Sequence, residues 1–188
     1  NLDPESARAK VTSRTKAIMP VHWAGYPCDM DEIYAVAREH NLTVLEDAAH
    51  ALGATYKSRP VGVLSRLTAF SFQAIKHLTT GDGGALCCLE DSDREEARRR
   101  RWFSIDRVRD QATILGERDY DLETLGFKYH LNDLAAAVGL GNLAGLAQAL
   151  DRHRAIAARY WAEFQGVPGV MLLERRPDRQ GSCWIFTL

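Results

Sequence analysis

Four polar positions could carry chemistry, because each lies at or just beyond the carboxyl end of a segment predicted to be a buried strand. They are, in chain order, His22, Asp47, Ser71 and Lys76. In open α/β sheets, ligands bind at the edge where the parallel strands end, so these four positions lie where a ligand site is expected. Taken singly, the histidine could be structural, the acidic residue a helix cap and the lysine solvated. Their combination is less common by chance.

A carboxylate, a hydroxyl and a lysine at neighbouring strand ends are the groups that a pyridoxal phosphate site requires. The amine of Lys76 would form an imine with the aldehyde of the cofactor. The carboxylate of Asp47 would hold the pyridine nitrogen protonated, and the hydroxyl of Ser71 would donate to the phosphate. Burial would lower the pKa of the lysine, which must lose its proton to react.

The elements that must position these groups begin as an alternation of strands and helices. Strands are predicted over residues 16–22, 42–45, 67–72 and 85–89. A helix is predicted over residues 29–41, with Asp29 and Glu32 forming a capping box at its start. Because the strands are continuously apolar rather than alternating, they indicate an α/β fold whose mostly parallel sheet is flanked by helices.

The second half of the chain is predicted to be mostly helical. The expected elements are a charged helix over 93–103, a polar irregular connection over 106–123, a long alanine-rich helix over about 132–165, and short strands over 170–173 and 184–188. Gly139, Gly141 and Gly145 argue against an unbroken helix. Pro168 and Gly169 end it.

The composition narrows the function classes. The chain has 188 residues, of which 46% are hydrophobic and 26% charged, and this suits one globular core. The net charge of −1 provides no field to attract nucleic acid or anionic lipid, so neither partner is expected. No apolar run approaches the roughly 18 residues of a membrane helix. Four cysteines without CxxC spacing and no visible signal peptide predict a cytoplasmic protein without a metal site.

Three ordered segments resemble the DegT/DnrJ/EryC1/StrS aminotransferases, which are fold-type I pyridoxal phosphate enzymes often called sugar aminotransferases. The segments run from Val21 to Pro27, from Glu46 to Ala54 and from Phe70 to Gly84, and the similarity continues through Gly126 to Asp133. The resemblance implies the large domain of that fold, here incomplete, followed by the start of a small C-terminal domain.

The resemblance also implies a role for five residues. Lys76 matches the lysine that forms the imine, and Asp47 matches the acid that pairs with the pyridinium nitrogen. His50 stands close to the phenolic oxygen of the cofactor, and Ser71 matches the serine that binds the phosphate. Lys128 replaces an asparagine that commonly reaches the phosphate of the neighbouring subunit. A homodimer with shared active sites is implied.

The same resemblance predicts the domain organisation. Residues 1–130 would be a partial cofactor-binding domain, residues 131–166 a long interdomain helix, and residues 167–188 the beginning of the small C-terminal domain. The glycine- and hydroxyl-rich phosphate loop of the family is absent here, so the chain would cover about the middle half of such an enzyme. His130 is a second departure from the family pattern, after Lys128, because arginine is common in the family at this position.

The expected activity is the transfer of an amino group from an amino acid, glutamate by resemblance, to a keto group of a nucleotide-linked sugar. Relatives that dehydrate sugars have histidine in place of the lysine, and Lys76 disfavours that reaction. Two alternatives stay open: a cyclitol or aminohydroxybenzoate precursor as the acceptor, and an inactive fragment that retains only the fold.

Overall fold

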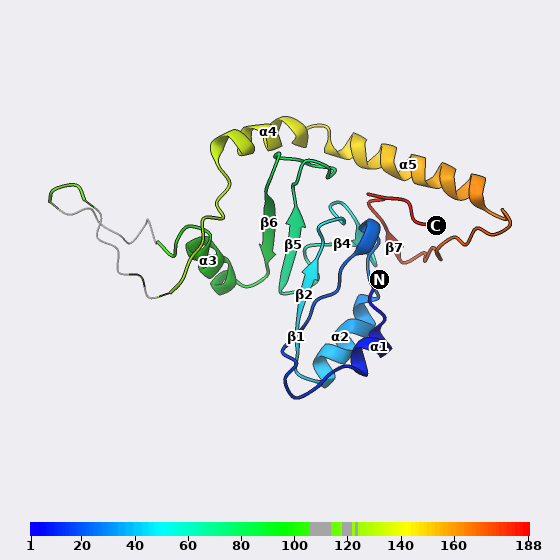
Figure 1. Ribbon diagram of the computed structural model, residues 1–188, viewed down its shortest axis with the longest axis horizontal. Coiled ribbons are helices and arrows are strands. Elements are labelled where there is room, and N and C mark those ends of the chain that lie inside the picture. The colour runs from blue at the N-terminus through cyan, green and yellow to red at the C-terminus, as the bar shows by residue number, and fades with distance from the viewer. Residues whose placement is uncertain (106–113, 118–121, 123) are drawn as a thin grey trace.

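The computed structural model describes residues 1–105, 114–117, 122 and 124–188. Within them, a four-stranded sheet stands at the centre, with α1 (Pro4–Arg8) and α2 (Met30–Glu39) at one end and α3 (Asp91–Arg100) beyond its far edge. Two further helices, α4 (Asp133–Leu143) and α5 (Leu146–Phe164), run across the edge toward which β2 and β5 point (Figure 1).

The main sheet contains the four strands that the sequence predicts. They are β1 (Ala17–Ile18), β2 (Thr43–Asp47), β5 (Leu67–Ser71) and β6 (Gly84–Cys88), in the spatial order β1-β2-β5-β6. The first three are parallel and β6 is antiparallel to β5, which confirms the mostly parallel α/β sheet. β1 is shorter than predicted because Pro20 has no N–H to donate, and Val21 resumes the pairing as an isolated bridge to Asp47.

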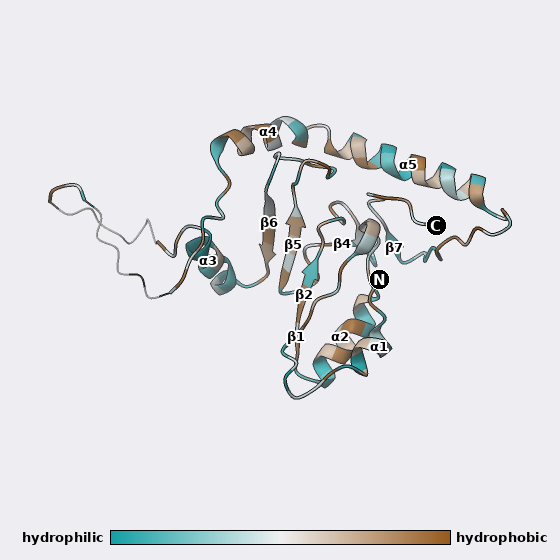
Figure 2. Ribbon diagram, in the orientation of Figure 1, coloured by the Kyte–Doolittle hydropathy of each residue, from teal (hydrophilic) through white to brown (hydrophobic). Residues whose placement is uncertain are grey.

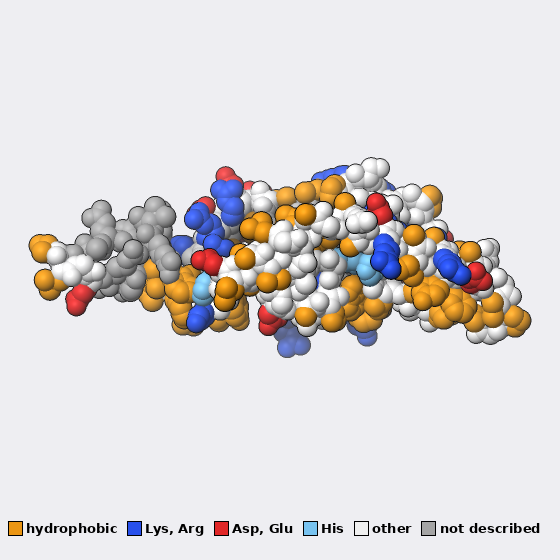
Figure 3. Space-filling model, turned by 90° about the horizontal axis from the view of Figure 1, so that it is seen from above, with side chains coloured by type: hydrophobic (Ala, Val, Ile, Leu, Met, Phe, Trp, Pro, Cys, Tyr) orange, Lys and Arg blue, Asp and Glu red, His pale blue; other side chains and the backbone are white. Residues whose placement is uncertain are grey.

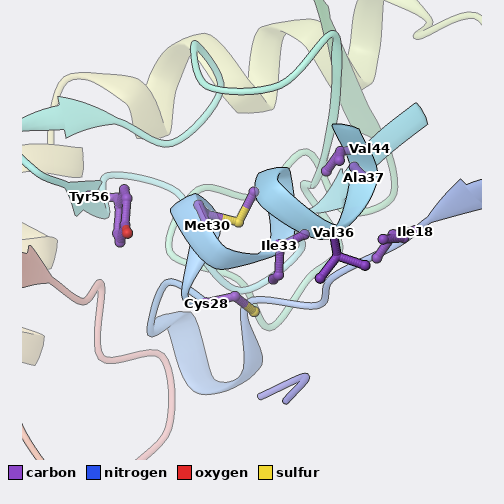
Figure 4. Close-up of a cluster of buried hydrophobic side chains, with 8 residues drawn as sticks. All are labelled: Ile18, Cys28, Met30, Ile33, Val36, Ala37, Val44 and Tyr56. Carbon is purple, nitrogen blue, oxygen red and sulfur yellow. The ribbon is translucent and has the colours of Figure 1, made fainter. Parts of the chain in front are cut away.

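The main hydrophobic core lies between α2 and the β1–β2 end of the sheet (Figure 4). Met30, Ile33, Val36 and Ala37 recur at helical spacing, so they form one buried face of α2. The other members of this core are Ile18, Cys28, Val44 and Tyr56. The central strand β5 is largely hydrophobic, whereas the peripheral helix α3 is hydrophilic over most of its length (Figure 2).

The predicted capping box at the start of α2 is wrong. The side chain of Asp29 makes no capping hydrogen bond; its Oδ1 instead accepts from Arg176 and Arg179, each at 2.7 Å. The Arg179 side chain is only 3% exposed. Leaving its buried charge without a carboxylate would cost more free energy than leaving the start of the helix without a side-chain cap. This contact fastens the C-terminal part of the chain to the start of α2.

A second, three-stranded sheet was not predicted. Its strands are β3 (Thr55–Tyr56), β4 (Arg59–Pro60) and β7 (Arg179–Gln180), all antiparallel, in the order β4-β3-β7. Lys57 and Ser58 have positive φ angles of 48° and 63°, the geometry of a type I′ hairpin turn. The strands predicted over 170–173 and 184–188 are absent. Beyond β7, the backbone N–H groups of Ser182 and Trp184 donate to Gly25 and Ala24 instead of to a strand.

The single long helix predicted over 131–166 is divided in two. α4 and α5 meet at Ala144 and Gly145 with a bend of 61°. Glycine at this point weakens the continuous helix, as its low propensity predicts. The division into domains at 130 and 166 stays a prediction, and most of the connection predicted over 106–123 lies outside the described residues. No single helix in the described part of the chain is both long enough and apolar enough to span a membrane. The bent pair α4–α5 meets these two criteria only when its helices are counted together.

Replacement of Ile33 tests the main core. Ile33 is fully buried, so Ile33→Ala should lower the free energy of unfolding by about 2–5 kcal/mol through lost burial and the cavity left behind. Ile156→Ala on α5, where the isoleucine is 45% exposed, is the matched control and should change it far less. Urea denaturation measures both, and equal losses would contradict the assignment of the core.

Candidate active site

The pleat of β2 separates the two acidic residues at its end. Successive side chains of a strand point to opposite faces, so Glu46 and Asp47 diverge. Glu46 is buried, and its Oε2 lies 2.6 Å from Nε2 of the equally buried His22. Nδ1 of His22 accepts from the backbone N–H of Cys28 at 3.1 Å, so the proton is on Nε2 and is donated to Glu46. His22 is therefore a structural residue, which is the more common role of a histidine at the end of a strand.

Asp47 is held at the carboxyl end of β2 on the face away from this pair. Its backbone carbonyl accepts from the N–H of His22 at 3.0 Å, which ties β2 to the end of β1. One carboxylate oxygen, Oδ1, accepts from the N–H of Ala49 at 3.0 Å. The carboxylate is half-buried. Burial lowers the pKa of both Lys76 and His50, and the negative charge of Asp47 partly opposes that lowering. Asp47, His50 and Lys76 thus share one electrostatic environment.

Lys76 sits in a loop that leaves β5 and returns as β6. The base of the loop is closed by a hydrogen bond from Phe72 N to Gly83 O at 2.8 Å. Within it, Gln73 N donates to Ser71 Oγ at 3.3 Å, and Lys76 N donates to Gln73 O at 3.0 Å. Two successive tight turns therefore join Ser71 to Lys76, and the hydroxyl hydrogen of Ser71 is left to donate.

The amine of Lys76 lies against an aromatic ring. Its Nζ is 3.8 Å from the ring centroid of Trp184. Burial lowers the pKa of the amine, and the negative charge of Asp47 opposes that change. A lysine in this environment loses its proton more readily than a solvated one.

His50 packs between two tryptophans. Its ring stacks on Trp184 at a centroid distance of 3.9 Å and an interplanar angle of 26°, and Trp23 meets it edge-on at 5.2 Å. Burial, and then the charge of Lys76, lower the pKa of His50, so the imidazole is neutral at pH 7. Its Nδ1 is buried and has no hydrogen-bond partner among the described residues.

The segment that brings Trp184 to the site was not recognised in the sequence. Ser182 Oγ donates to His50 O at 2.6 Å, and Ser182 N donates to Gly25 O at 3.0 Å. Gly25 has a φ of +83°, and a Cβ there would lie 2.0 Å from Ser182 Oγ, so only glycine allows this close approach. The sequence pattern at 184–188 indicates a strand, and nothing in it points to a ring beside Lys76.

Lys128 is not brought to this site. Its side chain is exposed, and its backbone pairs with Trp102 just beyond α3. No contact described in the structure joins it to Lys76, Asp47, His50 or Ser71. His130, two residues on, meets the Trp102 ring edge-on at 4.1 Å. The role of Lys128 toward a neighbouring phosphate stays a prediction.

The four groups at the site fit pyridoxal phosphate. A reactive amine, a carboxylate and a hydroxyl lie around the same edge of the sheet, at Lys76, Asp47 and Ser71. The unpartnered Nδ1 of His50 is a buried polar atom that a ligand oxygen would satisfy. Because leaving such an atom unpaired is costly, it marks the side of the site on which a polar ligand belongs.

A mostly parallel sheet with these groups beyond its strand ends is the large-domain architecture of the fold-type I pyridoxal phosphate transferases. The chain belongs to the DegT/DnrJ/EryC1/StrS aminotransferase family, whose model matches residues 1–188.

Two characterised relatives show how close the similarity is. The chain is 45% identical over 192 residues to the spore coat polysaccharide biosynthesis protein SpsC of Bacillus subtilis, covering 100% of this chain and 49% of that protein. It is 41% identical over 159 residues to the GDP-perosamine synthase of Caulobacter vibrioides, covering 85% and 39%. The chain spans about half the length of these relatives or less.

Solved structures agree with the fold. The sugar aminotransferase CalS13 from Micromonospora echinospora superposes with a TM-score of 0.92 at 38% identity, over 99% of this chain and 51% of that one. The sugar aminotransferase Spr1654 from Streptococcus pneumoniae, described as putative and solved in its PLP form, gives 0.83 at 27% identity, over 98% and 50%.

The histidine beside Lys76 predicts acid sensitivity. Burial, then the neighbouring His153 ring at 4.6 Å, lower the pKa of His77 from 6.5 to about 4. The unfolded chain takes up this proton near pH 6.5, whereas the folded chain resists it until about pH 4. Between these values the unfolded state binds more protons, so the free energy of unfolding should fall as the pH falls.

Denaturation at pH 7, 5.5 and 4.5 measures this effect. His77→Gln should flatten the decline, because glutamine takes up no proton. His40→Gln, which replaces an exposed histidine, should leave the decline as it is in the wild type. An unchanged decline in His77→Gln would contradict the prediction.

Proposed function

We propose that the protein is a pyridoxal phosphate-dependent aminotransferase that moves an amino group from an amino acid to a keto group of a nucleotide-linked sugar. The observation that carries the proposal is the position of the Lys76 amine. It is partly buried, and it is close enough to His50 and Asp47 for their charges to interact. Membership of the aminotransferase family supports the reaction class, and the sugar aminotransferase among the solved structures supports the acceptor class.

Each residue of the site would contact a different part of the cofactor. When bound, pyridoxal phosphate supplies an aldehyde that captures amines and a ring that accepts electrons from the substrate carbon. Lys76 would hold the aldehyde carbon covalently, and Asp47 would accept a hydrogen bond from the protonated ring nitrogen. Nδ1 of the neutral His50 would donate to the ring oxygen, which would give that buried atom its partner. Ser71 would donate its hydroxyl hydrogen to the phosphate.

Lys76 has a second task once its amine is released. Its Nζ would take a proton from the substrate carbon as a general base and return it to the carbon of the cofactor's former aldehyde as a general acid. Burial lowers the pKa of this amine, which increases the fraction of the free base near neutral pH. A histidine cannot provide the covalent attachment, so lysine at this position favours amino transfer over dehydration.

The substrates are proposed at the level of their chemistry. Glutamate is the proposed donor and a nucleotide-linked ketosugar the proposed acceptor, and the relative that makes GDP-perosamine is consistent with the second. Incubation with glutamate and a panel of nucleotide-linked ketosugars, with 2-oxoglutarate release as the readout, tests both. Turnover confined to cyclitol or aromatic acceptors would refute the sugar assignment.

A homodimer is part of the proposal. Large apolar side chains on α4 are exposed, with Leu134 at 83% and Leu140 at 70%, and hydrophobic side chains gather on the face that α4 and α5 form (Figure 3). Exposed apolar side chains of this kind suit burial against a second copy. In such a dimer, Lys128 would reach the phosphate of the neighbouring site as a point charge.

Lys76→Ala tests the covalent role directly. Addition of pyridoxal phosphate followed by borohydride should attach the cofactor to Lys76 in the wild type and abolish that modification in the variant, as peptide mass spectrometry measures. Loss of the general base should also lower kcat by roughly 10²–10⁴-fold. Lys57→Ala is the matched control, because Lys57 also lies over an aromatic ring, at 5.5 Å from Tyr56. Equal attachment in Lys76→Ala would end the proposal.

Asp47→Asn separates binding from catalysis. The amide cannot hold the ring nitrogen protonated, so kcat should fall by on the order of 10²–10³-fold while attachment to Lys76 persists. Asp82→Asn in the exposed turn of the same loop is the control and should retain activity. An active Asp47→Asn would show that another group holds the ring nitrogen.

A further inference from the structure

We propose that Trp184 is a positioning residue of this site, whose indole face holds the amine of Lys76 next to the reacting atoms whenever that amine is free. The inference rests on the proposed function, in which Lys76 alternates between covalent attachment and a free amine. It assigns a role to a residue 108 positions further along the chain than Lys76.

The geometry is that of a cation–π contact. Nζ of Lys76 lies 3.8 Å from the ring centroid of Trp184, well inside the limit of about 6 Å for such contacts. Tryptophan provides the most attractive ring face for an ammonium, and both side chains are half-buried, which strengthens the attraction. The same indole stacks on His50, so one ring contacts two groups of the site.

Trp184 is itself held firmly. Its Nε1 donates to Ile75 O at 3.0 Å and its backbone N donates to Ala24 O at 3.1 Å. Two residues earlier, Ser182 is bonded to His50 O. The bond to Ile75 joins the ring to the residue that precedes Lys76, so the indole and the lysine loop move together. Rotation of the ring away from the amine would break the bond from Nε1 to Ile75 O.

A fixed ring matters because lysine is a flexible side chain. Its four-carbon stem samples many rotamers when nothing holds the amine. Catalysis needs the proton-transferring group within hydrogen-bond reach of the reacting carbon, and small misplacements reduce the rate strongly. The ring face attracts the amine most when it is protonated, the state that must return its proton, and keeps it beside His50 and Asp47.

The chain contains a matched pair outside the site. Arg175 lies over the ring of Trp161 on α5 at 4.7 Å, and neither residue contacts Lys76, His50 or Asp47 in the described part of the chain. Trp161→Leu therefore removes an indole and a cation–π contact without touching the site. Trp184→Leu removes the ring face from Lys76 but keeps an apolar side chain, and Trp184→Phe keeps a smaller ring.

The first experiment uses the purified protein freed of cofactor. The rate at which an acylating reagent labels Lys76 is followed across pH by peptide mass spectrometry, and the rate at pH 8 is divided by the plateau rate at high pH. That ratio cancels accessibility and reports ionisation alone. Loss of the ring removes a stabiliser of the ammonium, so the ratio should rise about threefold in Trp184→Leu, less in Trp184→Phe, and not at all in Trp161→Leu. An unchanged ratio in Trp184→Leu would overturn the proposal.

A second measurement needs no variant at position 184. Reductive ¹³C-methylation labels the five lysines (Lys10, Lys16, Lys57, Lys76 and Lys128), and Lys76→Arg identifies the resonance of Lys76. An amine over an indole face should resonate upfield of the exposed lysines through the ring current, and urea should remove the difference. A Lys76 resonance at the position of the exposed lysines would refute the contact.

Kinetics with the loaded enzyme complete the test. Trp184→Phe should lower kcat with little change in KM for the acceptor, because it loosens the amine without altering substrate contacts. Both experiments on the cofactor-free protein succeed or fail whatever the reaction is. If the proposed function is wrong, the labelling ratio should still rise in Trp184→Leu. If the role of Trp184 is wrong, pyridoxal phosphate should still attach to Lys76.

Discussion

The alternation of side chains at the end of β2 is the constraint on which the site depends. Glu46 turns inward to the buried His22, and this hydrogen bond fixes which face of the strand is internal. Asp47, one residue on, must then face the opposite side, toward His50 and Lys76. A shift of the strand by a single residue would exchange the two carboxylates, placing an uncompensated charge in the interior and no acid at the site.

Two distant parts of the chain complete what β2 begins. Residues 47–76 supply the acid, the imidazole, the hydroxyl and the amine, whereas residues 179–184 supply a wall. The wall is anchored at both ends: Arg179 binds Asp29, and Trp184 binds Ile75. Between them, Ser182 passes so close to Gly25 that no side chain fits there. The site is thus rigid on the side where the lysine amine lies, which suits a group that must act at a fixed place.

Local patterns were sufficient to predict the elements that carry the site. The apolar runs predicted all four strands of the main sheet, and the polar residues after them predicted that Asp47, Ser71 and Lys76 lie at one edge. The family resemblance alone placed His50 there. What failed depended on partners far away in the sequence. Asp29 has the spacing of a capping box, yet it binds two arginines about 150 residues later. β3, β4 and β7 contain two residues each, too few to produce a periodic signal, and β7 pairs with β3 more than 120 residues earlier. The ring of Trp184 reaches Lys76 only through such pairing.

The bond between Trp184 and Ile75 spans 109 residues and has a consequence for the order of assembly. During synthesis the lysine loop emerges long before the segment that walls it, and contacts of such separation form late because a long loop must close first. β1, β2 and β5 can pair as soon as residue 71 is free, so the nascent chain presents a shaped sheet edge with a bare, fully solvated Lys76. Lys76 and His50 both acquire the indole of Trp184 only when residue 184 arrives, so these two groups are the last of the four to mature.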